Sequence, residues 1–231
     1  MTIPPSFYRA AAGCSFASAV TTLALIFLPA FYAPGEGFDA RMARVDDPAY
    51  QLRAWIYLVH PFLVLTAALG LALLLRTRAT VLALIGFLGF LLWAFTEAGQ
   101  QTLTLFAFDP WREAYATADA ATRDAIRLRT DIYDGIWNGM YVLLLIGFAI
   151  GNLCFGIAMV RVRDFTRIVG LFLLAAFALT LTNFAGEFGF ALPAPLDSWS
   201  YPAIQPLGRV LVGIWLWRAA ATGPRATANV A

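Results

Sequence analysis

One glutamate and two glutamines interrupt an otherwise apolar stretch of the sequence. They lie in "FTEAGQQ", residues 95–101, inside a run that extends from Ala79 to Phe108. An ionisable side chain in apolar surroundings costs free energy unless it is protonated, paired with a cation or hydrated. A carboxylate in such a place is typical of proton-handling and acid–base sites. Glu97 is therefore the first candidate functional residue.

Polar residues elsewhere in the chain repeat at the spacing of a helix face. Around Glu97 these residues are Trp93, Gln100, Gln101 and Thr104. The corresponding half of the other apolar segments carries Arg53, Tyr57 and His60, then Asp131, Asp134, Asn138 and Tyr141, then Thr180, Asn183 and Glu187, and last Gln205 and Arg209. A charged side chain in hydrocarbon costs roughly 2.5–3.5 kcal/mol, so these faces should turn toward one another or toward water. The pattern predicts a polar cup in one half of a membrane bundle.

Ten residues form the predicted ligand site of this cup. They are Tyr57, His60, Trp93, Glu97, Gln100, Gln101, Asn138, Asn183, Glu187 and Arg209. Trp93 precedes Glu97 by about one helical turn and is expected to form an apolar floor. No residue is assigned a catalytic role. For any single one of these residues the alternative remains that it only joins helices, at roughly 0.6 kcal/mol per hydrogen bond.

The Glu97 carboxylate should have a cationic partner inside the bundle. Arg209, His60 and Arg53 are the candidates, and Arg209 is the one that we favour. Asn183 or Glu187 should lie beside it.

Several kinds of chemistry are excluded by residue types that the chain lacks. There is no lysine, which removes sites that need a Schiff-base amine. The single histidine, His60, excludes multi-histidine metal sites and leaves at most one axial haem ligand, so the cofactor stays unassigned. The sequence contains no basic patch interleaved with exposed aromatic residues, so it gives no indication of nucleic-acid binding. Cys14 and Cys154 are expected to be unpaired thiols.

Composition places the chain in a lipid bilayer. Hydrophobic residues make up 61% and charged residues 13%, against roughly 25% charged in soluble domains. Apolar runs of spanning length lie at about 11–33, 53–75, 79–107, 135–160, 166–192 and 203–221. The prediction is an all-α, polytopic bundle of six transmembrane helices, a single domain over 1–221, followed by a disordered tail at 222–231.

The arginines predict the orientation of this bundle. Those on one side are Arg9, Arg76, Arg78, Arg161, Arg163, Arg167, Arg218 and Arg225, accompanied by one acid, Asp164. Positive charge collects on the cytoplasmic side of membrane proteins. Both termini should therefore be cytoplasmic, in a bacterial inner membrane, and the cup should open outward.

Connections and glycines predict finer features. "DDPAY" and "FDPWRE" each place an aspartate before a proline, which is typical of a helix start. The first should run on into the second membrane helix, and 111–132 should form a short amphipathic helix on the outer surface.

Glycines of the fourth membrane helix predict close contacts with neighbouring helices. They form the pairs Gly135 with Gly139 and Gly147 with Gly151, and they predict a central position for this helix.

Residues 8–221 carry a family resemblance. The stretch "LLLIGFAIGNLCFGIAMVRVRDFTRIVG", the six apolar runs and the arginine-rich turns resemble a large bacterial family of six-helix membrane proteins classed as a domain of unknown function. The resemblance implies the architecture and assigns no residue a role.

Three functions fit these observations. The favoured one is a protein that binds or moves a small amphipathic molecule, a lipid or a proton-coupled solute. The second is an accessory subunit that contacts a membrane-protein partner or a second copy. The third is an acid–base enzyme acting on a lipid, with Glu97 or Glu187 as proton donor.

Overall fold

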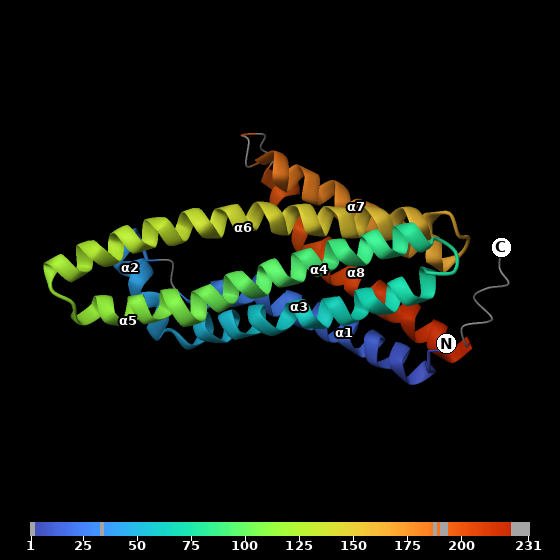
Figure 1. Ribbon diagram of the computed structural model, residues 1–231, viewed down its shortest axis with the longest axis horizontal. Coiled ribbons are helices and arrows are strands. Elements are labelled where there is room, and N and C mark those ends of the chain that lie inside the picture. The colour runs from blue at the N-terminus through green and yellow to red at the C-terminus, as the bar shows by residue number, and fades with distance from the viewer. Residues whose placement is uncertain (1–2, 33–34, 187–188, 190–193, 223–231) are drawn as a thin grey trace.

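A computed structural model describes residues 3–32, 35–186, 189 and 194–222, with side chains described up to 186, at 189 and over 203–221. All regular structure in these residues is helical. The helices are α1 (Pro5–Phe27), α2 (Gly37–Ala43), α3 (Pro48–Leu75), α4 (Thr80–Leu103), α5 (Asp109–Thr117), α6 (Ala120–Val160), α7 (Phe165–Gly186) and α8 (Ala194–Thr222) (Figure 1). Thr222 ends α8, and the rest of the predicted tail lies outside the described residues.

Five helical segments in the described residues are long and apolar enough to cross a bilayer. They are Pro5–Ala30, Pro48–Leu75, Thr80–Thr117, Ala120–Val160 and Phe165–Gly186. The all-α membrane architecture predicted from the composition is thus confirmed at this level, while the sixth span stays a prediction.

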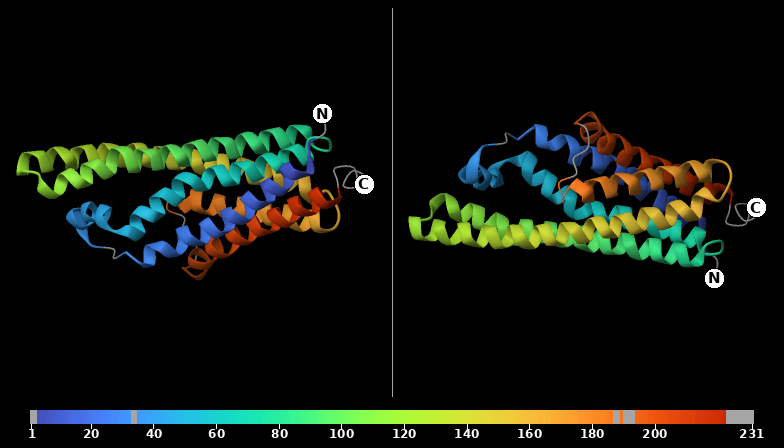
Figure 2. Two further views of the ribbon diagram at one scale, coloured as in Figure 1. Left: turned by 90° about the horizontal axis from the view of Figure 1, so that it is seen from below. Right: turned by 90° about the horizontal axis from the view of Figure 1, so that it is seen from above.

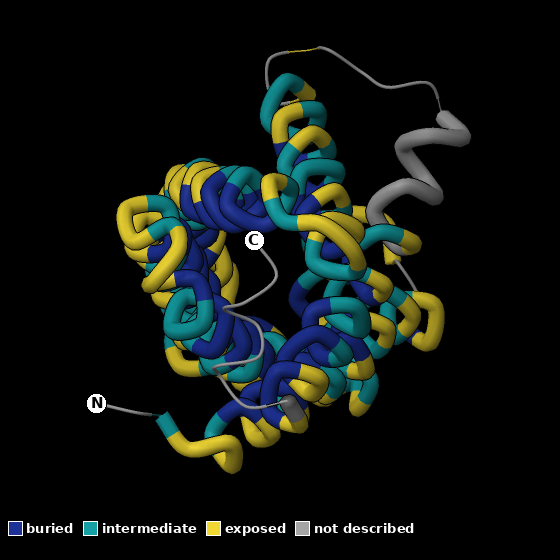
Figure 3. The backbone as a smooth tube through the Cα atoms, turned by 90° about the vertical axis from the view of Figure 1, so that its right-hand side faces the viewer, coloured by how far each residue is buried: buried dark blue, intermediate teal, exposed yellow. Residues whose placement is uncertain are grey.

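The six long helices form a ring. Each packs mainly on two neighbours, in the order α1, α3, α4, α6, α7, α8 and back to α1, and Figure 3 shows the bundle end on. The start of α1, the α3–α4 turn, the α6–α7 turn and the end of α8 lie at one end, here called the proximal end, and the opposite end is the distal end (Figure 1). No long helix is surrounded by the others, so the prediction of a central fourth membrane helix was wrong.

Glycines let α4 and α6 touch through their backbones. A Cβ on Gly147 would lie 2.7 Å from the Trp93 nitrogen and 2.8 Å from the Gly89 oxygen, and one on Gly89 would lie 2.6 Å from the Gly151 nitrogen. Close approach was therefore predicted correctly for Gly147 and Gly151. Gly135 and Gly139 have nothing within 4 Å of an added Cβ, because that part of α6 is exposed.

The α6 helix extends well beyond the thickness of a membrane. Its 41 residues span about 61 Å at 1.5 Å per residue, roughly twice a 30 Å hydrocarbon core. Together with α5 it projects past the other helices at the distal end (Figure 2). The Asp119 carboxylate accepts a hydrogen bond from the Thr122 backbone nitrogen at 2.8 Å, which starts α6 and lowers the pKa of Asp119.

The predicted separate helix at 111–132 is not present. Its first residues belong to α5 and the others to α6, which contains no proline to break it. Ile126, Thr130 and Tyr133 form a buried stripe on this part of α6, so the segment packs as a hairpin instead of lying alone on a surface.

Only the first of the two Asp-Pro sequences starts a helix with an aspartate cap. Asp47 caps α3 by accepting hydrogen bonds from the Ala49 and Tyr50 nitrogens, as predicted. Asp109 caps nothing, because α4 continues into α5 through a π-helical turn at Thr104–Phe108. The Asp109 nitrogen bonds the Thr104 oxygen five residues back, and such a wider turn accommodates Pro110, which has no N–H to donate.

The exterior of α4 is apolar and its interior is polar toward the distal end. Its exposed residues include Val81, Leu84, Ile85, Leu88, Leu92 and Phe95. The opposite face buries Trp93, Glu97, Gln100 and Gln101. A lipid environment requires this arrangement, in which apolar side chains face outward and polar side chains face the interior of the bundle.

Candidate functional site

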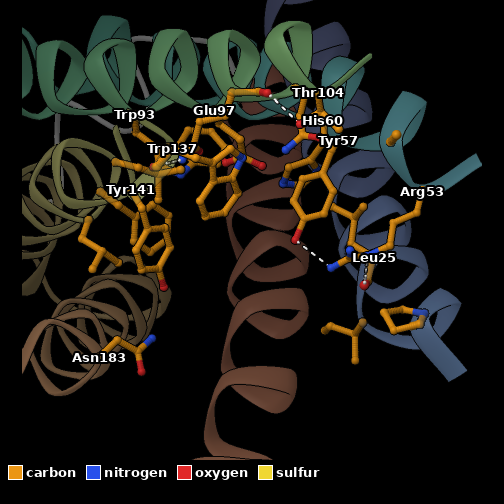
Figure 4. Close-up of a pocket in the computed structure, with 18 of the residues that line it drawn as sticks. Leu25, Arg53, Tyr57, His60, Trp93, Glu97, Thr104, Trp137, Tyr141 and Asn183 are labelled. Atoms are coloured by element: carbon orange, nitrogen blue, oxygen red, sulfur yellow. Dashed lines mark hydrogen bonds between the residues drawn. The ribbon is translucent and has the colours of Figure 1, made fainter. Parts of the chain in front are cut away.

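A cavity of about 1030 Å³ lies inside the distal half of the ring (Figure 4). All six long helices contribute to its wall, together with the short helices α2 and α5 and the turn that follows α2. Eight of the ten predicted site residues line it: Tyr57, His60, Trp93, Glu97, Gln100, Gln101, Asn183 and Arg209. The helix faces that were predicted from polar residues at helical spacing thus line one cavity.

One predicted site residue that the structure describes is not part of this wall. Asn138 is exposed and does not line the cavity, so its inclusion was wrong. The face of α6 that lines the cavity carries Tyr133, Trp137 and Tyr141 instead. Glu187 lies outside the described residues.

Aromatic rings close the proximal end of the cavity. The His60 and Trp93 rings meet edge to face at 6.0 Å, and Trp93 is tilted against Phe148 at 5.8 Å. The His60 Nδ1 atom is hydrogen-bonded to the Thr21 hydroxyl at 2.7 Å, which fixes the ring against α1. Trp93 therefore occupies the floor position that its spacing predicted.

Arg209 places a cation at this floor. Its guanidinium carbon lies 5.7 Å from the Trp93 ring centre and 5.8 Å from that of Phe148. Its charge acts on the Glu97 carboxylate, and that side chain is only 5% exposed. Within the described part of the chain no ion pair closer than 4.0 Å joins the two, so their attraction acts over a longer distance.

Other polar residues of the wall join α4 to α6. The Gln100 side-chain nitrogen donates to the Trp137 backbone oxygen at 2.9 Å. The Thr104 hydroxyl is 2.7 Å from the Tyr133 hydroxyl. Gln100 and Thr104 thus hold the wall together, whereas no side-chain hydrogen bond or ion pair with another described residue accounts for the position of Glu97.

Arg112 is a buried cation of the distal wall that the sequence did not single out. It is 5% exposed and pairs with Asp109 at 2.9 Å. It also donates to the Tyr50 hydroxyl and lies 4.2 Å from the Phe108 ring centre. The i, i+3 spacing of Asp109 and Arg112 was a usable signal, but the aspartate had been interpreted as a helix cap.

Arg41 joins the distal rim of the cavity to α6. Its two terminal nitrogens donate to the Asp134 carboxylate at 2.7 and 2.5 Å. This bidentate contact raises the pKa of Arg41. It connects residues far apart in the chain, and no spacing pattern predicts such a contact.

Arg53 enters the wall from α3, near its distal end. Its Nε donates to the Leu25 backbone oxygen at 3.3 Å, and its terminal nitrogens donate to the hydroxyls of Tyr32 and Tyr57 at 3.2 and 3.4 Å (Figure 4). The guanidinium also lies 4.9 Å from the Tyr57 ring centre. Its hydrogen-bond partners among the described residues are neutral oxygens.

No cluster of three or more potential metal-ligating side chains occurs in the part of the chain that the structure describes. No family model, curated protein or solved structure matches the chain. The resemblance to a bacterial six-helix family therefore stays a prediction.

Proposed function

We propose that this protein binds a small amphipathic molecule in the distal cavity, and either retains it or moves it into or out of the membrane. The observation that carries the proposal is the convergence of polar side chains from α3, α4, α7 and α8 on one cavity. Its volume of about 1030 Å³ is at the upper end of the roughly 300–1,000 Å³ of small-molecule sites. Polar groups beside aromatic walls suit a ligand with a polar and an apolar part.

A tryptophan introduced into the cavity should displace this ligand. Asn183 lies on the cavity face of α7, and Leu181, two residues earlier, is 47% exposed on another face. We expect Asn183→Trp to lose at least about 90% of a small molecule that co-purifies with the wild-type protein, because the indole fills the space. Native mass spectrometry of the full-length protein from zwitterionic nanodiscs measures the bound fraction.

Leu181→Trp is the matched control, since it adds the same side chain outside the cavity. It should retain the ligand. Equal occupancy in both variants, or no bound small molecule in any of them, contradicts the proposed function.

We further propose that α8 is a sixth span and that the proximal end is cytoplasmic. The described arginines at that end are Arg9, Arg76, Arg78, Arg161, Arg163, Arg167 and Arg218, with Asp164 as the acid among them. This asymmetry is the one that topology in bacterial membranes follows. The cavity then opens toward the outer leaflet.

Reporter fusions test this orientation. An alkaline phosphatase fused after Ala231 should be inactive, and the same enzyme fused after Ala118, between α5 and α6, should be active. A fluorescent protein that folds only in the cytoplasm should give the reverse pattern. Phosphatase activity at Ala231 with none at Ala118 would place the cavity on the cytoplasmic side.

An accessory-subunit role is the second candidate. The distal part of α6 exposes Leu128, Ile132 and Ile136 at 64%, 59% and 53%. They are four residues apart and so share one face, beyond the part of α6 that fits in hydrocarbon. A stoichiometric protein partner that is lost on Ile132→Asp would favour this role over ligand binding.

A further inference from the structure

We propose that the ligand is an acidic amphiphile whose carboxylate or phosphate head is held by Arg44 and Arg53, with its apolar chain directed toward Trp93. This inference rests on the proposed function, because it names the chemical class that the same cavity takes. It goes beyond that function in assigning a charge, an orientation and two recognition residues that the sequence did not predict for the head group.

Positive charge dominates the described wall of the cavity. Its arginines are Arg41, Arg44, Arg53, Arg112 and Arg209, and Glu97 is its one carboxylate among the described lining residues. A cavity with this balance attracts anions and disfavours cations. Neutral ligands gain nothing from it.

Three of the five arginines already have an acid to balance them. Asp134 binds Arg41 and Asp109 binds Arg112 at ion-pair distance, although neither acid lines the cavity. Arg209 acts on Glu97. These three arginines therefore contribute to the wall without requiring an anionic ligand.

Arg44 and Arg53 differ from those three. Neither has a carboxylate within 4.0 Å in the described part of the chain. The Arg44 Nε atom is buried and lacks a hydrogen-bond partner among the described residues, a feature that it shares with the Arg112 Nε atom. Within the part of the chain that the structure describes, Arg53 donates to neutral oxygens, in long bonds of 3.2–3.4 Å. A guanidinium binds a carboxylate or phosphate more strongly than it binds such oxygens, through two parallel hydrogen bonds.

The depth of Arg53 matches that of a lipid head group. It precedes Leu75, the proximal end of α3, by 22 residues. That distance is about 33 Å along the helix, close to the roughly 30 Å of a hydrocarbon core. Arg44 comes earlier in the chain, in the turn Arg44–Asp46 before α3, and both line the cavity. The two cations therefore lie near the level at which an anionic head group resides.

The wall proximal to Arg53 is suited to a chain. Between the levels of Arg53 and Trp93 it includes the apolar Ala54, Leu144, Leu145 and Phe148, beside polar side chains such as Tyr57 and Gln101. A free inorganic anion would leave this part without a contact, while a head group with an attached chain covers both parts. The shape and charge of the cavity thus favour a single-chain acid or an anionic lipid over a small ion.

Binding of palmitate and of hexadecanol to the full-length protein tests this assignment. The two probes have the same chain length and differ in head-group charge, and both are titrated as mole fractions in phosphatidylcholine nanodiscs at pH 8. We expect palmitate to bind at least about tenfold more tightly, since its carboxylate forms charge-assisted hydrogen bonds with a guanidinium that a neutral hydroxyl group cannot form. Arg53→Gln and Arg44→Gln should each weaken palmitate at least about tenfold and leave hexadecanol unchanged.

Arg129→Gln is the matched control, because it removes one exposed positive charge from the same end of the molecule. It should leave palmitate affinity within about twofold. Arg53→Lys shows whether a loss of binding comes from a folding defect. It retains the positive charge, so it should keep part of the preference for palmitate over hexadecanol. A second set of nanodiscs containing phosphatidylglycerol distinguishes the two sources of the acid. If phosphatidylglycerol competes with palmitate, the natural ligand is a membrane lipid with an anionic head group. If it does not compete, the natural ligand is a free single-chain acid.

The outcomes separate this inference from the proposed function. If both probes bind equally, are insensitive to the Arg44 and Arg53 variants, and are still displaced by Asn183→Trp, the acidic class is wrong and the binding function stands. If Asn183→Trp displaces neither probe, both the acidic class of the ligand and the proposed binding function are wrong.

Discussion

Arg209→Ala is expected to lower the free energy of unfolding by about 3 kcal/mol, because it leaves the buried Glu97 carboxylate without the cation that acts on it. Arg209 also lies against the Trp93 and Phe148 rings, so its loss removes packing from the floor of the cavity. Reversible unfolding by sodium dodecyl sulfate in mixed micelles, followed by circular dichroism, measures the difference.

A second substitution shows whether charge causes the loss. Glu97→Gln retains shape and hydrogen-bonding capacity, so alone it should cost less than about 1 kcal/mol and should alter ligand binding. Combined with Arg209→Ala it should restore about half or more of the lost stability, since no buried charge then remains. Arg218→Ala, an exposed cation on the same helix, is the control and should cost less than about 1 kcal/mol. If the double variant is no more stable than Arg209→Ala, the attraction between Arg209 and Glu97 is not what stabilises the floor.

Gly147→Ala is expected to be the second most disruptive substitution, at about 2 kcal/mol or more. The new methyl group would lie 2.7 Å from the Trp93 nitrogen and 2.8 Å from the Gly89 oxygen. Both are backbone atoms, so α4 and α6 must separate, and overpacking of this kind typically costs about 1–3 kcal/mol. Separation would also move Trp93, so ligand binding should weaken with stability.

Gly139→Ala provides the comparison on the same helix, because nothing lies within 4 Å of its added Cβ. Alanine is the better helix former, so this variant should be neutral or more stable by about 0.5–1 kcal/mol. The same detergent titration measures both variants. Equal effects of the two substitutions would mean that α4 and α6 do not touch at Gly147.

Sequence patterns predicted the inward faces of α3, α4, α7 and α8 well. Within hydrocarbon a polar side chain can turn only toward the bundle interior, so polarity at helical spacing identifies the inner face. That constraint placed His60, Glu97 and Arg209 around one cavity before any contact was known. The buried interface of α4 with α6 was equally predictable from Gly147 and Gly151.

The same reasoning failed where a helix leaves the bilayer. On the distal part of α6 polar residues can face water, so Asn138 is exposed while Tyr133 and Trp137 face the cavity. Polarity no longer indicates the inner face there. Gly135 and Gly139 were misinterpreted for the same reason, since their part of α6 has no close neighbour.

Contacts between segments distant in sequence were also beyond prediction. Arg41 and Asp134 meet only because α2 packs on α5, which brings the Arg41 side chain to the distal part of α6. Asp109 was interpreted as a cap because a π-helical turn, which carries no simple sequence signature, joins α4 to α5. The cationic character of the distal wall therefore became visible only in three dimensions.

A cryo-electron microscopy structure of the full-length protein, purified with the lipids of its own membrane, tests the central claim most directly. We predict elongated non-protein density within the ring, with one end at hydrogen-bond distance, about 3 Å, from the Arg53 guanidinium and the other near Trp93. A cavity filled by protein side chains, or one holding only separate water-sized peaks, would contradict the claim that this space binds an amphiphile.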